Sequence, residues 1–243
     1  MTNIPDDHPR AASLRVREAM KDAVAAGLVH GTGLIAHGRG EAFDYLLGER
    51  TCTEAEAAIQ EAARLLRAAK RPVLSLNGDV VALAAAPCVA LARALPALRL
   101  EVNLFHRTPE RIDALVAAME AAGAAPGSVL GREPDARIPG LASDRALCCE
   151  AGIGGADVVL VPLEDGDRCQ ALRAMGKTVI TIDLNPLSRT ARTAHVTIVD
   201  ELTRALPILA KALVEPRQGA FDAMQNLAAV RRRMAARLLD DDG

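Results

Sequence analysis

The sequence predicts an α/β fold, with a Rossmann-like, mostly parallel sheet flanked by helices and additional N- and C-terminal helices. Segments patterned as strands alternate with segments patterned as helices, which is typical of right-handed βαβ units. The predicted strands are continuous runs of Val, Ile and Leu, as in parallel strands covered on both faces. Hydrophobic residues make up 50% of the chain but aromatic residues only 2%, so the core must be built from Ala, Leu, Val and Ile.

Each predicted element has its own local signals. Ser13 and Thr108 stand where helix N-caps are needed, Pro109 suits a first helical position, Gly27 suits a helix end, and residues 53–56 have the capping-box pattern. The predicted helices are residues 13–26, 53–69, 81–95, 109–122, 166–175, 201–214 and 221–239. The predicted strands are residues 72–76, 99–104, 157–161, 178–182 and 195–199.

The length of 243 residues fits a single domain, residues 1–243. We divide it into an N-terminal helical segment (about 8–70), a sheet core (about 71–214) and a C-terminal helix (about 218–240). Residues 124–150 are rich in Pro and Gly and form the longest candidate loop. Loops of that length are often functional.

Charge and composition exclude several classes of protein. A net charge of −2 argues against a nucleic-acid or anionic-membrane partner. No run approaches the ~20 apolar residues of a membrane span, and the first ten residues lack the apolar core of a signal peptide. The five cysteines include no CxxC pair, which favours reduced thiols over a disulfide framework or a zinc site. We therefore expect a cytoplasmic protein.

The most informative segment is GLIAHGRGEAFDYLLGE, residues 33–49. It sets His37, Arg39 and Glu41 among four glycines. Exposed backbone N–H groups beside glycine, together with an unshielded guanidinium, can bind phosphate or carboxylate. The alternative is an ordinary loop followed by a buried helix over residues 41–47.

Polar clusters follow several predicted strands, at the end where doubly wound sheets bind ligands. Residues 77–79 (Asn-Gly-Asp) form the first, and their plain alternative is a turn. In the second, residues 103–108, Arg107 precedes a helix N-terminus and could bind an anion, or could simply be the charged start of that helix. The third holds Glu164, Asp165 and Asp167, which could bind Mg²⁺ or a substrate ammonium, or form a solvated N-cap.

The fourth cluster, residues 183–192, could bind a nucleotide. Asp183 could accept hydrogen bonds from ribose, Asn185 could contact a base or ribose, and Arg189 with Thr190 could hold phosphate. Neither GxGxxG nor GxxxxGK[ST] occurs, so spacing alone leaves this site open.

Six segments of the chain resemble the archaeal phosphopantothenate synthetases, also called 4-phosphopantoate–β-alanine ligases. They occur in family order and cover residues 8 to 205 or so. They are HPRAASLRVRE (8–18), GLIAHGRGEAFDYLLGE (33–49), RPVLSLNGDVVAL (71–83), EVNLFHRTPER (101–111), ADVVLVPLEDGDR (156–168) and TIDLNPLSRTAR (181–192).

The resemblance implies an enzyme that joins 4-phosphopantoate to β-alanine at the expense of ATP, through an acyl-adenylate, with AMP and diphosphate formed. This is a step of coenzyme A biosynthesis. It also implies Mg²⁺ and a homodimer. The alternatives are a non-catalytic nucleotide-binding regulator and an ATP-dependent pantoate kinase.

The resemblance and the residue chemistry together give a set of site residues. Family ATP contacts fall on Arg17, Arg39, Asp183, Leu184, Asn185, Arg189, Thr190, Glu201 and Leu202. The predicted catalytic residues are His37, Arg39, Arg107 and Asp165, and the predicted Mg²⁺ ligands are Glu164 and Asp165. The predicted substrate-binding residues are Arg10, His37, Asn77, Arg107 and Asp167. Residues 201–202 depart from the family's Asn-hydrophobic pattern, and residues 77–79 from its more usual Asn-Gly-Asn.

Overall fold

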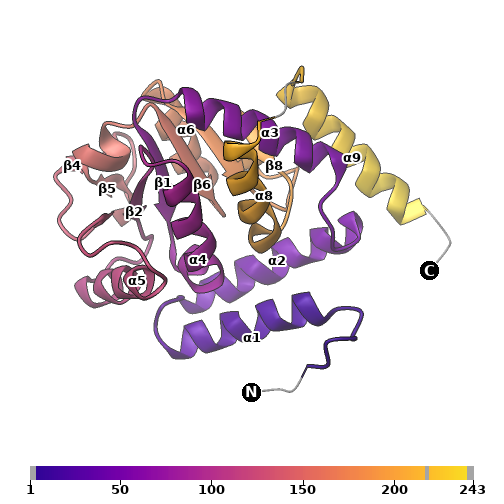
Figure 1. Cartoon of the computed structure of the whole chain (residues 1–243), viewed down its shortest axis with the longest axis horizontal. Helices are drawn as coiled ribbons and strands as arrows, with labels where there is room; N and C mark the ends of the chain where they lie inside the picture. Colours follow the sequence, from indigo (N-terminus) through magenta and orange to yellow (C-terminus); the bar gives the residue numbers. More distant parts are fainter. Residues whose placement is uncertain (1–3, 217–218, 240–243) are drawn as a thin grey trace.

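A computed structural model describes residues 4–216 and 219–239, and its centre is a parallel sheet (Figure 1). Within the described residues this sheet has six strands in the order β3-β2-β1-β6-β7-β8, all paired in parallel. They are β1 (Pro72–Leu76), β2 (Arg99–Val102), β3 (Val129–Leu130), β6 (Val158–Pro162), β7 (Thr178–Ile182) and β8 (Val196–Ile198). Numbered along the chain, this is the 3-2-1-4-5-6 order of doubly wound folds. The predicted α/β fold is confirmed.

Helices cover both faces of the sheet. One face packs against α3, α4, α5 and α8, and the other against α6 and residues 136–156. The helices are α1 (Ala11–Ala25), α2 (Gly31–Leu47), α3 (Thr53–Ala68), α4 (Gly78–Ala94), α5 (Pro109–Ala121), α6 (Gly166–Ala174), α7 (Arg189–Thr193), α8 (Leu202–Val214) and α9 (Ala223–Leu239). In the described part of the chain no helix is long and apolar enough to cross a membrane.

Several local expectations differ from the structure. Ser13 lies inside α1 and bonds Glu49, so the predicted N-cap is wrong. Helix α4 begins three residues early because the Asn77 side chain caps it. The 124–150 segment holds β3, the antiparallel pair β4 (Ala136–Arg137) and β5 (Leu147–Cys148), and the 3-10 helix η1 (Asp144–Ala146). Residues 218 and 240, at the ends of the predicted C-terminal segment, lie outside the described residues.

The glycine-rich segment is the main correction. It is one continuous helix, α2, whose N-terminus is capped by the His30 side chain, so the alternative of a loop followed by a helix over residues 41–47 is wrong. A Cβ on Gly33 would lie 2.7 Å from Asp79 Oδ1 and 2.7 Å from Val29 Cγ1. A Cβ on Gly38 would meet nothing within 4 Å. Gly33 therefore lets α2 approach the start of α4 closely, which a bulkier residue would prevent.

This contrast predicts opposite effects of two alanine substitutions. Gly38→Ala is expected to raise the free energy of unfolding by about 1 kcal/mol, the usual gain for Gly to Ala in an exposed helix interior. Gly33→Ala is expected to lower it by about 1–3 kcal/mol, because the new methyl group overpacks the contact with Val29 and Asp79. Urea unfolding of the two variants measures both. An equal rise in the free energy of unfolding for both variants would show that α2 and α4 are not closely packed at Gly33.

Candidate functional site

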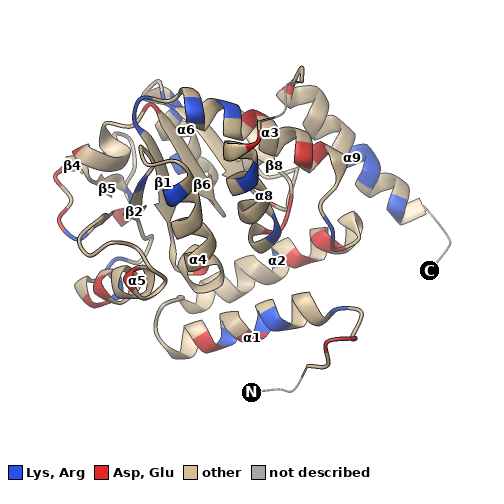
Figure 2. Ribbon diagram, viewed as in Figure 1, with Lys and Arg blue, Asp and Glu red and all other residues tan. Residues whose placement is uncertain are grey.

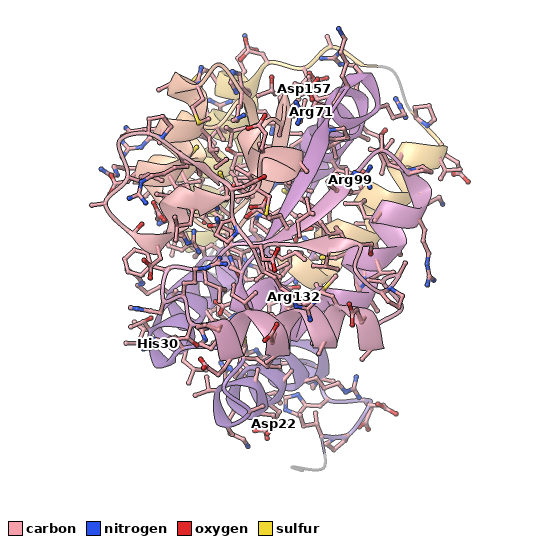
Figure 3. All side chains as sticks on the ribbon, turned by 90° about the vertical axis from the view of Figure 1, so that its left-hand side faces the viewer. Asp22, His30, Arg71, Arg99, Arg132 and Asp157 are labelled. Atoms are coloured by element: carbon pink, nitrogen blue, oxygen red, sulfur yellow. The ribbon has the colours of Figure 1, made fainter. Side chains whose placement is uncertain are left out.

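Helix α2 covers the carboxyl edge of the sheet (Figure 1). The chain runs outward from β1 through β2 to β3, and then from β6 through β7 to β8, so the direction of winding switches between β1 and β6. Ligands of doubly wound folds bind at this switch point, outside the carboxyl ends of the strands. In Figure 3, His30, which precedes α2, lies in the half of the molecule opposite Arg71 and Asp157, which mark the amino edge.

A cavity of about 410 Å³ opens at the switch point, and we call it the switch-point cavity. It lies between α2 and the segments that follow β1, β2 and β6. One of these segments contains Leu163, which has a φ of 54°, a strained conformation for a non-glycine residue. The charged and imidazole side chains lining the cavity are His30, Arg39, Asp79, His106, Arg111, Arg145, Glu164 and Asp165.

A second cavity of about 110 Å³ lies on the other side of α2, and we call it the β7–β8 cavity. It is enclosed by α1, α2, the residues after β7 and the start of α8. Its polar lining includes Arg10, His37, Glu41, Asp44, Glu49, Glu201 and Arg204. His37 lines this cavity and Arg39 lines the other, so α2 presents one face to each cavity.

His37 also acts electrostatically on the switch-point cavity. Burial raises the pKa of Asp79 above the ordinary Asp value, although the charges of His37, Arg145 and Arg111 oppose that rise. A charge on His37 therefore acts on Asp79 across α2.

A buried ion network forms one wall of the switch-point cavity. The two carboxylate oxygens of Glu164 each accept from a guanidinium, one from Arg145 and the other from Arg168. Arg168 also donates to Ser75 Oγ at 2.9 Å, and Arg145 Nη1 lies 3.3 Å from Asp165 Oδ2. The Glu164 and Arg168 side chains are only 1% and 2% exposed. Such an arrangement fixes the wall rigidly.

This network bears on the predicted Mg²⁺ ligands. Both oxygens of Glu164 are engaged by arginines, so we no longer propose Glu164 as a metal ligand. Asp165 caps α6 by accepting from the Arg168 amide at 2.8 Å. Burial acts to raise its pKa, but this hydrogen bond and Arg145 outweigh burial and lower it. Within residues 4–216 and 219–239 no group of three or more His, Cys, Asp or Glu side chains could hold a metal ion.

The predicted nucleotide residues lie after β7. Asp183 accepts from the Asn185 amide at 2.9 Å and from the Ser188 hydroxyl, and burial raises its pKa. The Thr190 hydroxyl donates to the Glu164 carbonyl oxygen at 2.8 Å, which ties α7 to the switch point. Arg189 pairs with Asp167, and both side chains are more than half exposed. Asp183 and Thr190 therefore build the loop, while Arg189 and Asp167 face solvent.

Two of the remaining predicted nucleotide residues, Leu184 and Glu201, border the β7–β8 cavity. Glu201 also caps α8 by accepting from the Thr203 amide at 2.7 Å. Leu202 is buried in the core. Arg17 Nε donates to Glu41 at 2.8 Å, and Arg17 also donates to the Tyr45 hydroxyl at 3.0 Å.

The predicted substrate residues are divided among different places. Arg10, which borders the β7–β8 cavity, pairs with Glu41 and Glu49. Figure 2 shows acidic residues on α2 above basic residues on α1, in keeping with these pairs. Asn77 lines the switch-point cavity, but its amide nitrogen donates to Pro162 O at 3.1 Å and its oxygen caps α4. Arg107 is not in that lining, because it donates to the carbonyl oxygens of residues 131 and 132.

Sequence reasoning missed three arginines that line the two cavities. Arg111 lines the switch-point cavity and ties α5 to the Leu28 carbonyl oxygen at 3.0 Å, and burial lowers its pKa. Arg145 lies in the 124–150 segment. The length of that segment predicts a function for it, but no local sequence pattern singles out Arg145. Arg204, which pairs with Asp44 and Asp200 beside the β7–β8 cavity, has no sequence signal either.

A 3-2-1-4-5-6 sheet with charged cavities along its carboxyl edge defines a ligand-binding protein of the doubly wound α/β class. The sequence model of the phosphopantothenate/pantothenate synthetase family matches residues 54–235. The chain belongs to this family, and the expected resemblance is confirmed.

Curated relatives agree with the family match. A 4-phosphopantoate–β-alanine ligase of Methanosarcina mazei is 54% identical over 211 residues, which are 87% of this chain and 82% of the relative. A protein of the same name from Thermococcus kodakarensis is 52% identical over 85% of this chain and 78% of its own length. A third, from Methanospirillum hungatei, is 50% identical over 87% of this chain and 85% of its own length.

Proposed function

We propose that this protein is an ATP-dependent ligase that joins 4-phosphopantoate to β-alanine to form 4-phosphopantothenate in coenzyme A biosynthesis. The observation that carries the proposal is the 50–54% identity to curated enzymes named for this ligation. In support, two charged cavities lie side by side across α2, which suits a reaction that brings a nucleotide and two small acids together.

The chemistry requires activation of a carboxylate. A carboxylate is a poor electrophile toward an amine, so the acid is first joined to AMP, with diphosphate released. The amine of β-alanine then forms the amide as AMP departs. Because the reactants carry a triphosphate, a phosphate and two carboxylates, the site must hold several anions in fixed positions. Catalysis is then mostly positioning and electrostatic stabilisation.

We assign the nucleoside to the residues after β7 and the acid and amine to the switch-point cavity. Asp183, Leu184 and Asn185 form the nucleoside side, where Leu184 offers an apolar surface beside the β7–β8 cavity. Arg39 lines the switch-point cavity and is assigned to the phosphates, with Arg189 nearer the nucleoside. His37, which lines the β7–β8 cavity, is assigned to the phosphate of 4-phosphopantoate or to the acyl phosphate as it forms.

The described residues build no metal site of their own, so we propose that Mg²⁺ arrives with the nucleotide. Mg²⁺ is commonly held by substrate phosphates, waters and one or two carboxylates. Asp165, which lines the switch-point cavity, and the exposed Asp167 are the carboxylates that we propose would help to hold it. When bound, the ion would share the charge of the triphosphate.

We also propose that the enzyme is a cytoplasmic homodimer. All five cysteines are buried free thiols, which fits a reducing compartment. On α2, Leu34 and Ile35 are 39% and 66% exposed, and apolar side chains of that kind suit a contact between subunits. Light scattering during size-exclusion chromatography tests the dimer, which a monomer mass at micromolar concentration would exclude.

One assay separates the proposed function from its alternatives. The protein is incubated with ATP, Mg²⁺, 4-phosphopantoate and β-alanine, and adenine nucleotides are resolved by chromatography. We expect AMP, formed only when both acids are present. In a parallel incubation with pantoate in place of 4-phosphopantoate, conversion of ATP to ADP would indicate a kinase instead. Nucleotide binding without turnover would indicate a regulator.

A further inference from the structure

We propose that Arg145, in the wall of the switch-point cavity, binds the carboxylate of β-alanine and so holds the far end of the amine substrate while its nitrogen attacks. The proposal rests on the proposed function and deepens it, because it divides the anion-binding groups of the cavity between the two acids. Arg145 is a binding residue in this assignment and takes no part in bond making.

Arg145 is buried, yet its hydrogen-bonding capacity is not used up. The residue is 8% exposed and lines the cavity. Its Nη1 atom donates to Glu164 and lies 3.3 Å from Asp165 Oδ2. Within the described residues its Nε atom is buried without a hydrogen bond, and no hydrogen bond engages Nη2. A buried guanidinium with unused N–H groups costs stability, which is understandable where a substrate supplies the acceptor.

The position of Arg145 is fixed at both ends before any ligand arrives. Asn103, which follows β2 and is 1% exposed, donates from its side-chain nitrogen to Leu147 O at 2.8 Å and to Arg145 O at 3.3 Å. Glu164, which Arg168 also engages, holds the guanidinium. Backbone and head group are therefore both anchored. A receptor that is preorganised in this way loses little freedom on binding, which suits the orienting of a substrate.

The arginines of the cavity are of two electrostatic kinds. In the described part of the chain Arg39 has no hydrogen bond or ion pair, and Arg111 donates only to backbone carbonyl oxygens. Having no ion-pair partner, these two suit phosphate groups. Arg145 instead lies against the carboxylates of Glu164 and Asp165. Those carboxylates repel a doubly charged phosphate more strongly than a singly charged carboxylate, so Arg145 suits the carboxylate.

The chemistry of the two acids supports the same division. The carboxylate of 4-phosphopantoate has to be joined first to AMP and then to nitrogen, so it cannot stay bound to a rigid wall. The carboxylate of β-alanine takes part in neither step, and it can be held from binding to release. Holding it fixes the distance from the wall to the attacking nitrogen, which orients that nitrogen toward the activated acid.

The test combines a change in the protein with a matching change in the substrate. β-Alaninamide has the shape of β-alanine without its negative charge. We expect the unaltered protein to have a kcat/KM for β-alaninamide about 10- to 100-fold below that for β-alanine, the range for loss of a hydrogen bond between charged groups. We expect Arg145→Met to lower kcat/KM for β-alanine by about the same factor, and to change that for β-alaninamide by less than about threefold.

A second rate separates binding of the amine from activation of the acid. Exchange of labelled diphosphate into ATP, with 4-phosphopantoate and without any amine, reports activation alone. We expect Arg145→Met to keep this exchange within about threefold of the unaltered protein. Arg137→Met is the matched control, because Arg137 is an exposed arginine of the same 124–150 segment that lines neither cavity. It should leave all of these rates unchanged.

A second variant covers the structural contacts of Arg145. Arg145→Met removes a partner of Glu164, whereas Arg145→Lys keeps a positive charge there. Lysine does not reproduce the planar, forked geometry of the guanidinium, so Arg145→Lys should show the same selective loss with β-alanine, smaller in size. If Arg145→Met does not fold, the ratio of the two amines in Arg145→Lys decides.

Three results would overturn the assignment. They are equal use of β-alanine and β-alaninamide by the unaltered protein, equal losses with the two amines in the folded variants, and a loss of diphosphate exchange that matches the loss of amide formation. The last would place an anionic group of 4-phosphopantoate or ATP on Arg145 instead. If the unaltered protein shows neither exchange nor AMP formation, the proposed function itself fails, and the assignment falls with it.

Discussion

Replacing Glu164 with alanine is expected to lower the free energy of unfolding by about 3–5 kcal/mol, the usual cost of removing one partner from a buried ion pair. Glu164 neutralises Arg145 and Arg168, and the side chains of all three are at most 10% exposed. The substitution leaves the Arg168 guanidinium bonded to Ser75 Oγ without a carboxylate, and leaves Arg145 with Asp165 at 3.3 Å. Within the described residues, each guanidinium already has a buried Nε atom without a hydrogen bond. Equilibrium urea unfolding followed by circular dichroism gives the value.

Two comparisons make this result specific. Glu133→Ala removes an exposed carboxylate from the 124–150 segment, which also contains Arg145, and should change stability by no more than about 0.5 kcal/mol. Combining Glu164→Ala with Arg168→Met removes one stranded charge, so the double variant should lose less than the sum of its single changes. Additive losses, or a single loss under about 1 kcal/mol, would show that Glu164 does not hold the two arginines together.

Much of the fold can be predicted from the sequence because long buried strands and amphipathic helices leave a hydrophobic pattern in consecutive residues. The runs at residues 72–76 and 178–182 coincide with β1 and β7, since strands buried on both faces leave an uninterrupted apolar pattern. The short strand β3 and the pair β4–β5 have only two residues each, too few to show a pattern. Their positions depend on contacts with distant parts of the chain.

The α2 segment shows why the glycines misled. Gly usually weakens a helix, so GLIAHGRGE suggests a loop. At Gly33, however, the missing Cβ is needed because Asp79 and Val29 lie where it would point. That need is tertiary, and it is visible only once α4 is in place. The close approach also brings α2 against Asp79 at the edge of the switch-point cavity.

For the site, the positions of polar clusters are predictable, whereas their partners are not. The clusters after β1 and β6 do meet at the switch point, as parallel topology requires. Glu164 looks like a free ligand in the sequence, yet Arg145, which is 19 residues away, occupies one of its oxygens. Conversely, Asp79 looks like part of a turn, but it is the acid left without a partner among the described residues. Burial and pairing, which residue type does not reveal, separate the acid that two arginines engage from the acid that has no partner among the described residues.

Replacing Arg39 with alanine is expected to lower kcat/KM for ATP by about 100- to 1000-fold, equivalent to about 2.7–4 kcal/mol of transition-state stabilisation. Within the described part of the chain, Arg39 has no hydrogen bond or ion pair, although it lines the switch-point cavity. An arginine held there with its guanidinium free suits a phosphate that arrives with the substrate. In the proposed function the acid must reach the nucleotide phosphates to be activated, and our assignment puts Arg39 where the two substrates would meet. Steady-state kinetics with ATP varied measures the loss.

The size and specificity of that loss decide the role of Arg39. Arg39→Lys keeps the charge but not the bidentate geometry, so it should recover only part of the activity. Arg99→Ala removes an exposed arginine at the start of β2, away from the carboxyl edge, and should leave the kinetics unchanged (Figure 3). Arg39→Ala should leave the free energy of unfolding nearly unchanged, because the side chain has no partner to lose. A fall in kcat/KM of less than threefold would show that Arg39 does not bind the phosphates. A fall in the free energy of unfolding large enough to account for the lost activity would show that Arg39 has a structural role instead.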